Sequence, residues 1–166
     1  GKPIGNGHPM SAVVTKKEIA NSFANGMEFF ATFGGNPVSC AIGMAVLDVI
    51  KEEGLQEHAK KIGAGMIKGL NTLKDKHDII GHVRGIGLFI GIELVSVKGG
   101  NTLAPATQKA SEMVNRMKKR GILLGTDGPL NNVIKIKPPM VITKQDADMF
   151  IRVLDDELLS METAPC

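Results

Sequence analysis

Four segments of the chain carry apolar residues at the three-to-four spacing of a helix, and they differ in how much of the circumference is apolar. Residues 38–53 are apolar almost all the way round; Asn36 and Pro37 precede them as N-cap and first helical residue, and Gly54 ends them. Residues 55–76 carry one apolar stripe opposite lysines and glutamates. The pattern predicts a first helix buried on most sides, lying between two domains, and a second that covers one face of a core.

The second half of the chain alternates short apolar strands with two further helices. The helices are predicted at 107–120 and about 143–161, where Thr143 and Asp146 form the N-terminal cap. The strands are predicted at 79–83, 86–95, 122–125 and 133–136. In the second of these strands the residues expected to face the core are Ile86, Leu88, Ile90, Ile92 and Leu94. This order of elements predicts a small α+β sheet with helices on one face.

The first 35 residues and the loops give weaker signals. Residues 10–14 predict a short strand, and Thr15 with Glu18 predicts a capping box that opens a helix through about Phe23. The glycine-rich residues 99–101 predict a loop.

A domain boundary is predicted near residue 54. Residues 1–54 are expected to close a larger domain, residues 55–161 to form the small α+β domain, and residues 162–166 to be a frayed tail. Because the chain lacks an initial methionine and opens inside a motif, we expect it to be the C-terminal part of a longer protein.

Composition excludes several classes of function. The 166 residues carry 20 Lys+Arg and 17 Asp+Glu without a long block of either sign, and six Phe without Trp or Tyr, which does not suit nucleic-acid binding. The apolar runs fall short of the ~20 residues that span a membrane. Cys40 and Cys166 form no disulfide framework and show no metal-ligand spacing. We expect a soluble protein of the cytoplasm, or of the mitochondrial matrix if the source is eukaryotic.

Two glycine-rich segments carry the candidate chemistry. Residues 1–9, GKPIGNGHP, fix Lys2 in a loop whose glycines let the backbone approach a ligand closely; the alternative is an ordinary turn with a solvated lysine. Residues 32–37, TFGGNP, set the hydroxyl of Thr32 and several free N–H groups beside a helix N-terminus, which favours an anion such as phosphate. The alternative there is a simple helix cap.

Together with residues 83–94, VRGIGLFIGIEL, and 135–139, KIKPP, these segments resemble class III aminotransferases, a family of pyridoxal-phosphate enzymes. The resemblance covers the whole chain. It implies the end of the cofactor-binding large domain followed by a small α+β domain, a fold between α/β and α+β. It also implies a primary amine as substrate and a homodimer.

The resemblance assigns roles to single residues. Lys2 stands where the family has the lysine of the internal aldimine, which also moves a proton at the substrate carbon next to nitrogen. Thr32 stands where a threonine reaches the cofactor phosphate of the neighbouring subunit. The carboxylate partner of the pyridine nitrogen matches no motif residue here.

Lys135 departs from the family pattern, because class III aminotransferases usually carry an arginine at this place to hold a substrate carboxylate. Residues 125–129, GTDGP, and the motif KIKPPM look most like the phospho-lyase branch, which acts on phosphoethanolamine or phosphohydroxylysine. Lys135 is then a substrate-binding residue; its alternative is a salt bridge or a solvated strand lysine. An ω-aminotransferase, or a non-catalytic module that binds an anion or a partner, are the other functions left open.

Overall fold

The computed structural model describes residues 1–98 and 102–163 and falls into two compact units that meet in sequence between Gly54 and Leu55. The predicted loop at 99–101 and the last three residues of the predicted tail lie outside the described residues. None of the helices described here is both long and apolar enough to cross a membrane.

The first unit contains a 3₁₀ turn, η1 (Lys2–Gly5), and two helices, α1 (Lys17–Ser22) and α2 (Pro37–Glu52). The predicted start of α2 is confirmed, because the Asn36 side chain accepts a hydrogen bond from the Ser39 N–H and Pro37 is the first helical residue. Its predicted stop is confirmed as well, since Gly54 has a φ of 62°, which glycine adopts without strain.

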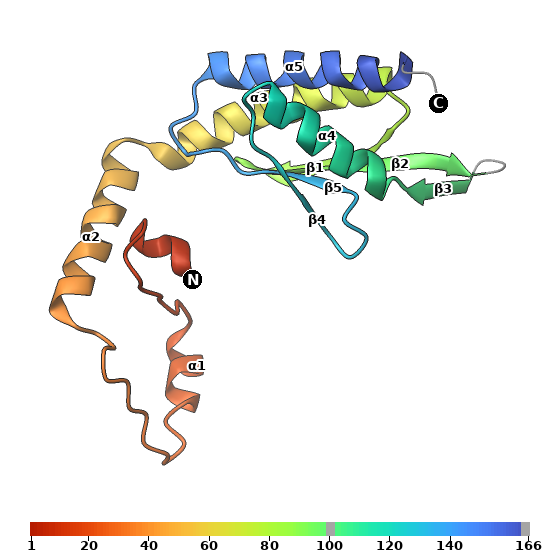
Figure 1. Cartoon of the computed structure of the whole chain (residues 1–166). Coiled ribbons are helices and arrows are strands. Elements are labelled where there is room, and N and C mark those ends of the chain that lie inside the picture. The colour runs from red at the N-terminus through yellow and green to blue at the C-terminus, as the bar shows by residue number, and fades with distance from the viewer. Residues whose placement is uncertain (99–101, 164–166) are drawn as a thin grey trace. The chain divides into compact units, whose positions relative to one another are not determined.

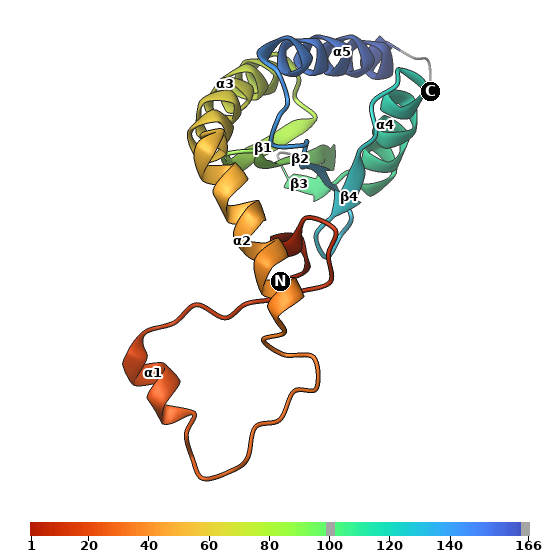
Figure 2. The same cartoon turned by 90° about the vertical axis from the view of Figure 1, so that its left-hand side faces the viewer.

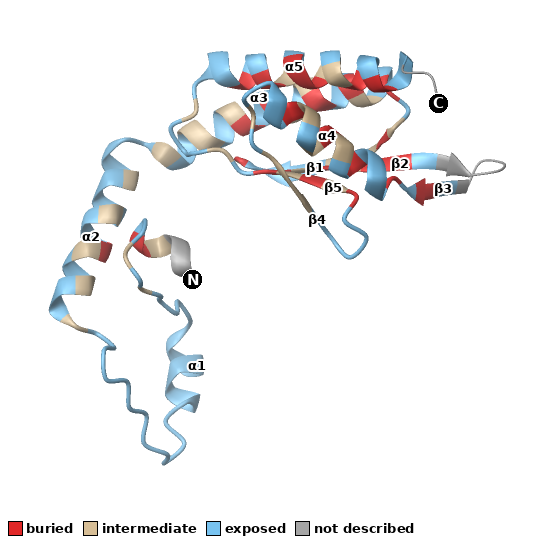
Figure 3. Cartoon of the chain, in the orientation of Figure 1, coloured by how far each residue is buried: buried red, intermediate tan, exposed pale blue. Residues whose placement is uncertain are grey.

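Three expectations for this unit are wrong. Residues 10–14 form no strand, because residues 1–54 contain no strand that could pair with them. Val13 and Val14 are 91% and 95% exposed. Helix α1 begins at Lys17 without a side-chain cap, so Thr15 and Glu18 make no capping box. Helix α2 is not buried on most sides: Gly43 is its single buried residue, and Figure 3 shows most of the helix as exposed or intermediate.

The second unit is a sheet with all of its helices on one face, as predicted (Figures 1 and 2). Its helices are α3 (Leu55–Lys76), α4 (Thr107–Lys119) and α5 (Lys144–Thr163). Its strands are β1 (Ile80–Ile86), β2 (Phe89–Lys98), β3 (Thr102–Pro105), β4 (Gly125–Asp127) and β5 (Val133–Ile136). The antiparallel strand order is β1-β2-β5-β4, and β3 pairs with β2. Helices α3 and α4 contact the sheet, and α5 packs against both of them.

The core lies between this sheet and the three helices. Figure 3 shows the buried positions on the inner sides of α3, α4 and α5 and along the strands. The strands contribute Ile90, Ile92, Leu94, Ile134 and Ile136, each no more than 3% exposed. Helix α5 starts with the predicted cap: Thr143 Oγ1 donates to Asp146 Oδ2 at 2.6 Å, and the Asp146 N–H donates back to Thr143 Oγ1 at 3.1 Å.

Several element boundaries differ from the prediction. The β1–β2 turn falls at Gly87, with a φ of 54°, so Ile86 ends β1 and is 84% exposed instead of entering the core. Strand β3 was not predicted, since four residues ending in proline give little strand signal. Strand β4 starts only at Gly125, although Ile122 already packs against the core. Helix α5 continues to Thr163, two residues into the predicted tail.

Candidate active site

Lys2 lies in the turn η1, where the Ile4 N–H donates to the Gly1 carbonyl at 3.1 Å. This turn packs against α2 through Met10. A Cβ atom placed on Gly5 would lie 2.8 Å from Met10 Cγ, and one on Gly43 of α2 would lie 2.6 Å from Met10 Cε. Glycine at both positions therefore lets the methionine side chain fit between the lysine-bearing loop and the helix.

A chain of hydrogen bonds joins the same loop to the start of α2. His8 Nε2 lies 2.7 Å from Ser39 Oγ, which also accepts a hydrogen bond from Asn36 Nδ2 at 3.0 Å. The second Asn36 amide hydrogen bond goes to the Phe33 carbonyl at 2.9 Å. Asn36 thus caps the helix, and its amide group holds the preceding turn while Ser39 holds His8.

Thr32 lies in that preceding turn and is exposed. The Gly34 N–H donates to the Ala31 carbonyl at 3.1 Å, and Gly35 has a φ of 68°. The turn leads directly into the first turn of α2. The two glycine-rich segments singled out in the sequence are therefore both fixed to one helix, Lys2 by the packing of η1 and Thr32 by the cap.

Lys135 lies in the second unit, on the face of the sheet opposite the helices. Strand pairing sets it in one row with Arg84, Gly91 and Gly125: Arg84 is opposite Gly91, Gly91 is opposite Lys135, and Lys135 is opposite Gly125. Residues opposite one another in neighbouring strands point to the same face. Gly91 thus lies between the two cationic residues, and Gly125 lies on the other side of Lys135. Because glycine has no side chain, both positions leave room above the sheet.

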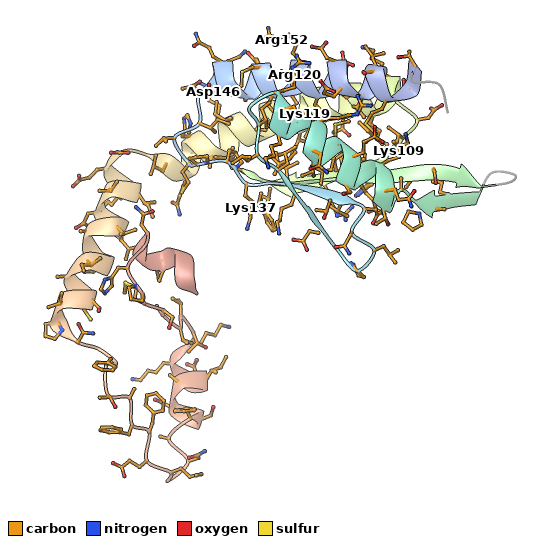
Figure 4. All side chains as sticks on the ribbon, viewed as in Figure 1. Lys109, Lys119, Arg120, Lys137, Asp146 and Arg152 are labelled. Atoms are coloured by element: carbon orange, nitrogen blue, oxygen red, sulfur yellow. The ribbon has the colours of Figure 1, made fainter. Side chains whose placement is uncertain are left out.

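An open pocket of about 420 Å³ lies over this row, bordered by Arg84, Phe89, Asp127 and Lys135 among others. Both cations have a carboxylate partner. Arg84 Nη1 donates to Glu93 Oε2 at 2.6 Å, and Lys135 Nζ donates to Asp127 Oδ2 at 2.6 Å. Lys137, on the side of the sheet away from α5 in Figure 4, has its Nζ 5.8 Å from the centre of the Phe89 ring.

Asp127 is fixed by more than the lysine. Its Oδ1 atom accepts a hydrogen bond from the Gly128 N–H at 2.8 Å. The hydrogen bond from Lys135, followed by that from Gly128, lowers the pKa of Asp127 below its usual value. Asp127 therefore stays ionised at neutral pH.

The structure shows the salt bridge that sequence analysis had named as the alternative for Lys135. Two residues that were quoted only within motifs of the resemblance, Asp127 and Arg84, also border the pocket. Asp127 lies eight residues before Lys135, around a tight turn with Gly128 at a φ of 83° and Asn131 at 50°. A hairpin signal over these residues could have indicated the pairing.

Comparison with known proteins identifies the family. The profile described as Aminotransferase class-III matches residues 1–158. The chain is 51% identical over 152 residues to a Drosophila melanogaster protein named alanine–glyoxylate aminotransferase 2-like, covering 90% of the chain and 30% of that protein. It is 43% identical over 162 residues to the ethanolamine-phosphate phospho-lyase homolog 1 of Caenorhabditis elegans, covering 97% of the chain and 34% of that protein.

Solved structures agree. The structure of a phospholyase from Arthrobacter in complex with phosphoethanolamine matches 99% of the chain and 38% of its own length, with a TM-score of 0.85 and 39% identity. Its fold supports the predicted architecture of a class III aminotransferase. The chain spans about a third of the length of these relatives. On the strength of the profile match and the shared fold, the chain belongs to the class III aminotransferase family.

Proposed function

We propose that the protein containing this chain uses pyridoxal phosphate to eliminate phosphate from a phosphorylated primary amine such as phosphoethanolamine. The observation that carries the proposal is the pocket around Lys135, where an ammonium group stands in one row with Arg84 on the open face of the sheet. The two phospho-lyase names among the relatives support it.

The residues of the first unit fit the cofactor chemically. Lys2 supplies a primary amine for the cofactor aldehyde, and the Thr32 turn offers a hydroxyl at the N-terminal end of α2, where the helix dipole favours a phosphate. Bound pyridoxal phosphate withdraws electrons from the substrate carbon next to nitrogen. In the proposal, the Lys2 amine removes the proton from that carbon.

Lys135 holds the other end of the substrate in this proposal. Its ammonium binds the phosphate group, and the electron pair left by the departing proton expels that phosphate from the adjacent carbon. Lys2 would return its proton to the dephosphorylated product, and water would hydrolyse that product to an aldehyde and ammonia. No keto acid takes part, so one substrate and water account for all products.

A homodimer belongs to the same proposal, with Thr32 serving the cofactor of the partner subunit. The first unit carries large apolar side chains that are at least 70% exposed in this single chain: Val13, Val14, Met27, Phe29, Phe30 and Phe33. Such a surface favours association. Sedimentation of the full-length protein tests this, and a monomer with full activity would contradict it. The cellular compartment, cytoplasm or mitochondrial matrix, stays a prediction.

An ω-aminotransferase is the second candidate, because the Drosophila relative carries an aminotransferase name. Incubation of the full-length protein with phosphoethanolamine alone separates the two. Release of phosphate and ammonia in equal amounts supports the lyase. Consumption of the amine only when a keto acid is added supports the aminotransferase. An absence of any cofactor-dependent visible absorption band, with no borohydride-fixed label on Lys2, would remove both.

A further inference from the structure

The ammonium of Lys135 already has a partner at the pocket. Asp127 Oδ2 accepts its hydrogen bond at 2.6 Å, while Asp127 Oδ1 accepts from the Gly128 N–H at 2.8 Å. The Asp127 side chain is 55% exposed and that of Lys135 is 32% exposed, so water reaches the pair. An ion pair in contact with water contributes little net stability, which makes the lysine exchangeable between partners.

The same geometry places a fixed negative charge beside any anion that binds Lys135. Asp127 is held to the turn by Gly128, and both residues border the pocket, as do Arg84 and Lys135. A carboxylate about 4 Å from a bound anion weakens its binding by about sixfold per negative charge in water, hence by about 30-fold for a dianion. The carboxylate of Glu93, bonded to Arg84 at 2.6 Å, adds a second source of such repulsion farther along the row.

We propose that Asp127 is the resting counter-ion of Lys135 and limits how tightly the pocket retains a doubly charged anion. An entering phosphate group shares or displaces Asp127 on the lysine, and Asp127 takes the ammonium back when free phosphate departs. In this way the pair favours release of an inorganic dianion over its retention. The inference rests on the proposed function only in taking phosphate as the group concerned.

Asp127→Asn isolates the charge, because the amide oxygen can still accept the Gly128 hydrogen bond. Asp148→Asn is the matched control: Asp148 forms an ion pair with Lys144 on α5 and does not border this pocket. Sulfate and methanesulfonate are suitable probes, since both are tetrahedral and fully ionised at pH 7.5 but differ by one charge. Calorimetry on the full-length protein gives the dissociation constant of each, and steady-state kinetics give the inhibition constant of inorganic phosphate.

Asp127→Asn is expected to lower the dissociation constant of methanesulfonate by about sixfold and that of sulfate by about 30-fold. The inhibition constant of inorganic phosphate should fall to a similar extent. The Asp148→Asn control should change none of these, and Lys135→Gln added to Asp127→Asn should remove most of the gain. Equal tightening of the two probes, no change, or weaker binding would overturn the inference. Asp127→Ser provides a second neutral variant in case the asparagine disturbs the turn.

The outcome is separate from that of the proposed function. If Asp127→Asn binds sulfate more strongly by a larger factor than methanesulfonate, but the protein releases no phosphate from phosphoethanolamine, the lyase proposal is refuted and the counter-ion role stands. Phosphate release with no charge-graded gain would do the reverse.

Discussion

His8 and Ser39 are 31 residues apart in sequence, yet His8 Nε2 lies 2.7 Å from Ser39 Oγ. This hydrogen bond attaches the loop that carries Lys2 to the first turn of α2. Ser39 also belongs to the Asn36 cap, so one short network fixes both glycine-rich segments. The position of the proposed reactive lysine therefore depends on a helix cap as well as on its own loop.

His8→Ala should lower the free energy of opening this loop by about 1 kcal/mol, the usual net contribution of one hydrogen bond. Ser39→Ala should lower it by at least as much, because it also removes the acceptor of the Asn36 amide. Backbone amides of residues 5–8 and 10 should exchange hydrogen about fivefold faster in either variant, the ratio that corresponds to about 1 kcal/mol. The double variant should be no looser than Ser39→Ala alone, because Ser39→Ala already removes the bond to His8. Ser22→Ala, which removes an exposed side-chain bond within α1, is the control. Strictly additive effects would contradict a direct coupling.

Two glycines of α3 should respond oppositely to alanine. A Cβ atom on Gly63 would lie 2.0 Å from the Gly87 carbonyl oxygen, so Gly63→Ala forces the helix away from the β1–β2 turn and should destabilise by about 1–3 kcal/mol. A Cβ atom on Gly65 meets nothing within 4 Å, so Gly65→Ala should stabilise by up to about 1 kcal/mol. Urea denaturation measures both, and effects of the same sign would contradict the close approach.

Asp155 should make the second unit sensitive to acid. Lys76 Nζ donates to its Oδ2 at 2.7 Å, and Nε2 of the buried His77 lies 2.6 Å from its Oδ1. The hydrogen bond from Lys76, opposed by partial burial and reinforced by that from His77, lowers the pKa of Asp155. A lowered pKa in the folded state stabilises the fold above the unfolded pKa of about 3.9, and this stabilisation disappears as pH falls through the folded value.

Asp155→Asn should therefore lower the free energy of unfolding by about 1–2 kcal/mol at pH 7. The difference from the unmodified protein should shrink below about pH 4, where the carboxylate becomes protonated in the unmodified protein too. Denaturation curves at a series of pH values check this, with Asp78→Asn, an exposed position next to His77, as control. A difference that stays constant down to pH 2 would contradict the assignment.

Lys2→Ala should abolish turnover in the full-length protein, by about 10²–10⁴-fold or more, because it removes both the attachment of the cofactor and the proton carrier. Lys16→Ala, which removes an exposed lysine of the same unit, should leave turnover unchanged. Turnover is measured as phosphate or amine conversion under saturating cofactor. Equal activity of the two variants would refute the role proposed for Lys2.

Lys135→Gln should raise the KM for phosphoethanolamine by about 10–100-fold, the loss expected for one hydrogen bond to a charged group, with a smaller effect on kcat. The control Lys144→Gln removes a lysine that pairs with Asp148 on the surface of α5. A fall in kcat at unchanged KM would assign Lys135 to the chemistry and not to substrate binding.

The sequence predicted the elements that depend on local signals. The Asn36–Pro37 start of α2, the Thr143–Asp146 cap of α5 and the glycine stop at Gly54 each need only neighbouring residues, and all three are confirmed. The inward face of β2 also follows from alternation alone. Strand residues 10–14 failed because a strand requires a partner that sequence periodicity does not reveal.

The candidate site was predicted only in part for the same reason. Lys2, Thr32 and Lys135 came from motif resemblance, and their roles stay predictions. Asp127 was quoted only within the motif of residues 125–129 and received no role, because its contact with Lys135 depends on the register between β4 and β5. The burial of α2 was overpredicted for a different reason. A helix that is apolar on all sides indicates packing partners, but the sequence does not show whether this chain supplies them, and here its apolar residues are exposed.

The row of Arg84, Gly91, Lys135 and Gly125 makes ligand binding a test of strand alignment. If β5 slipped by one residue against β2, Lys135 would turn into the core and Ile134 or Ile136 would face water. A misaligned protein with normal helix content would then lack the anion pocket entirely. Titration with a simple oxyanion can thus distinguish correctly registered protein from compact misfolded species that circular dichroism would count as native.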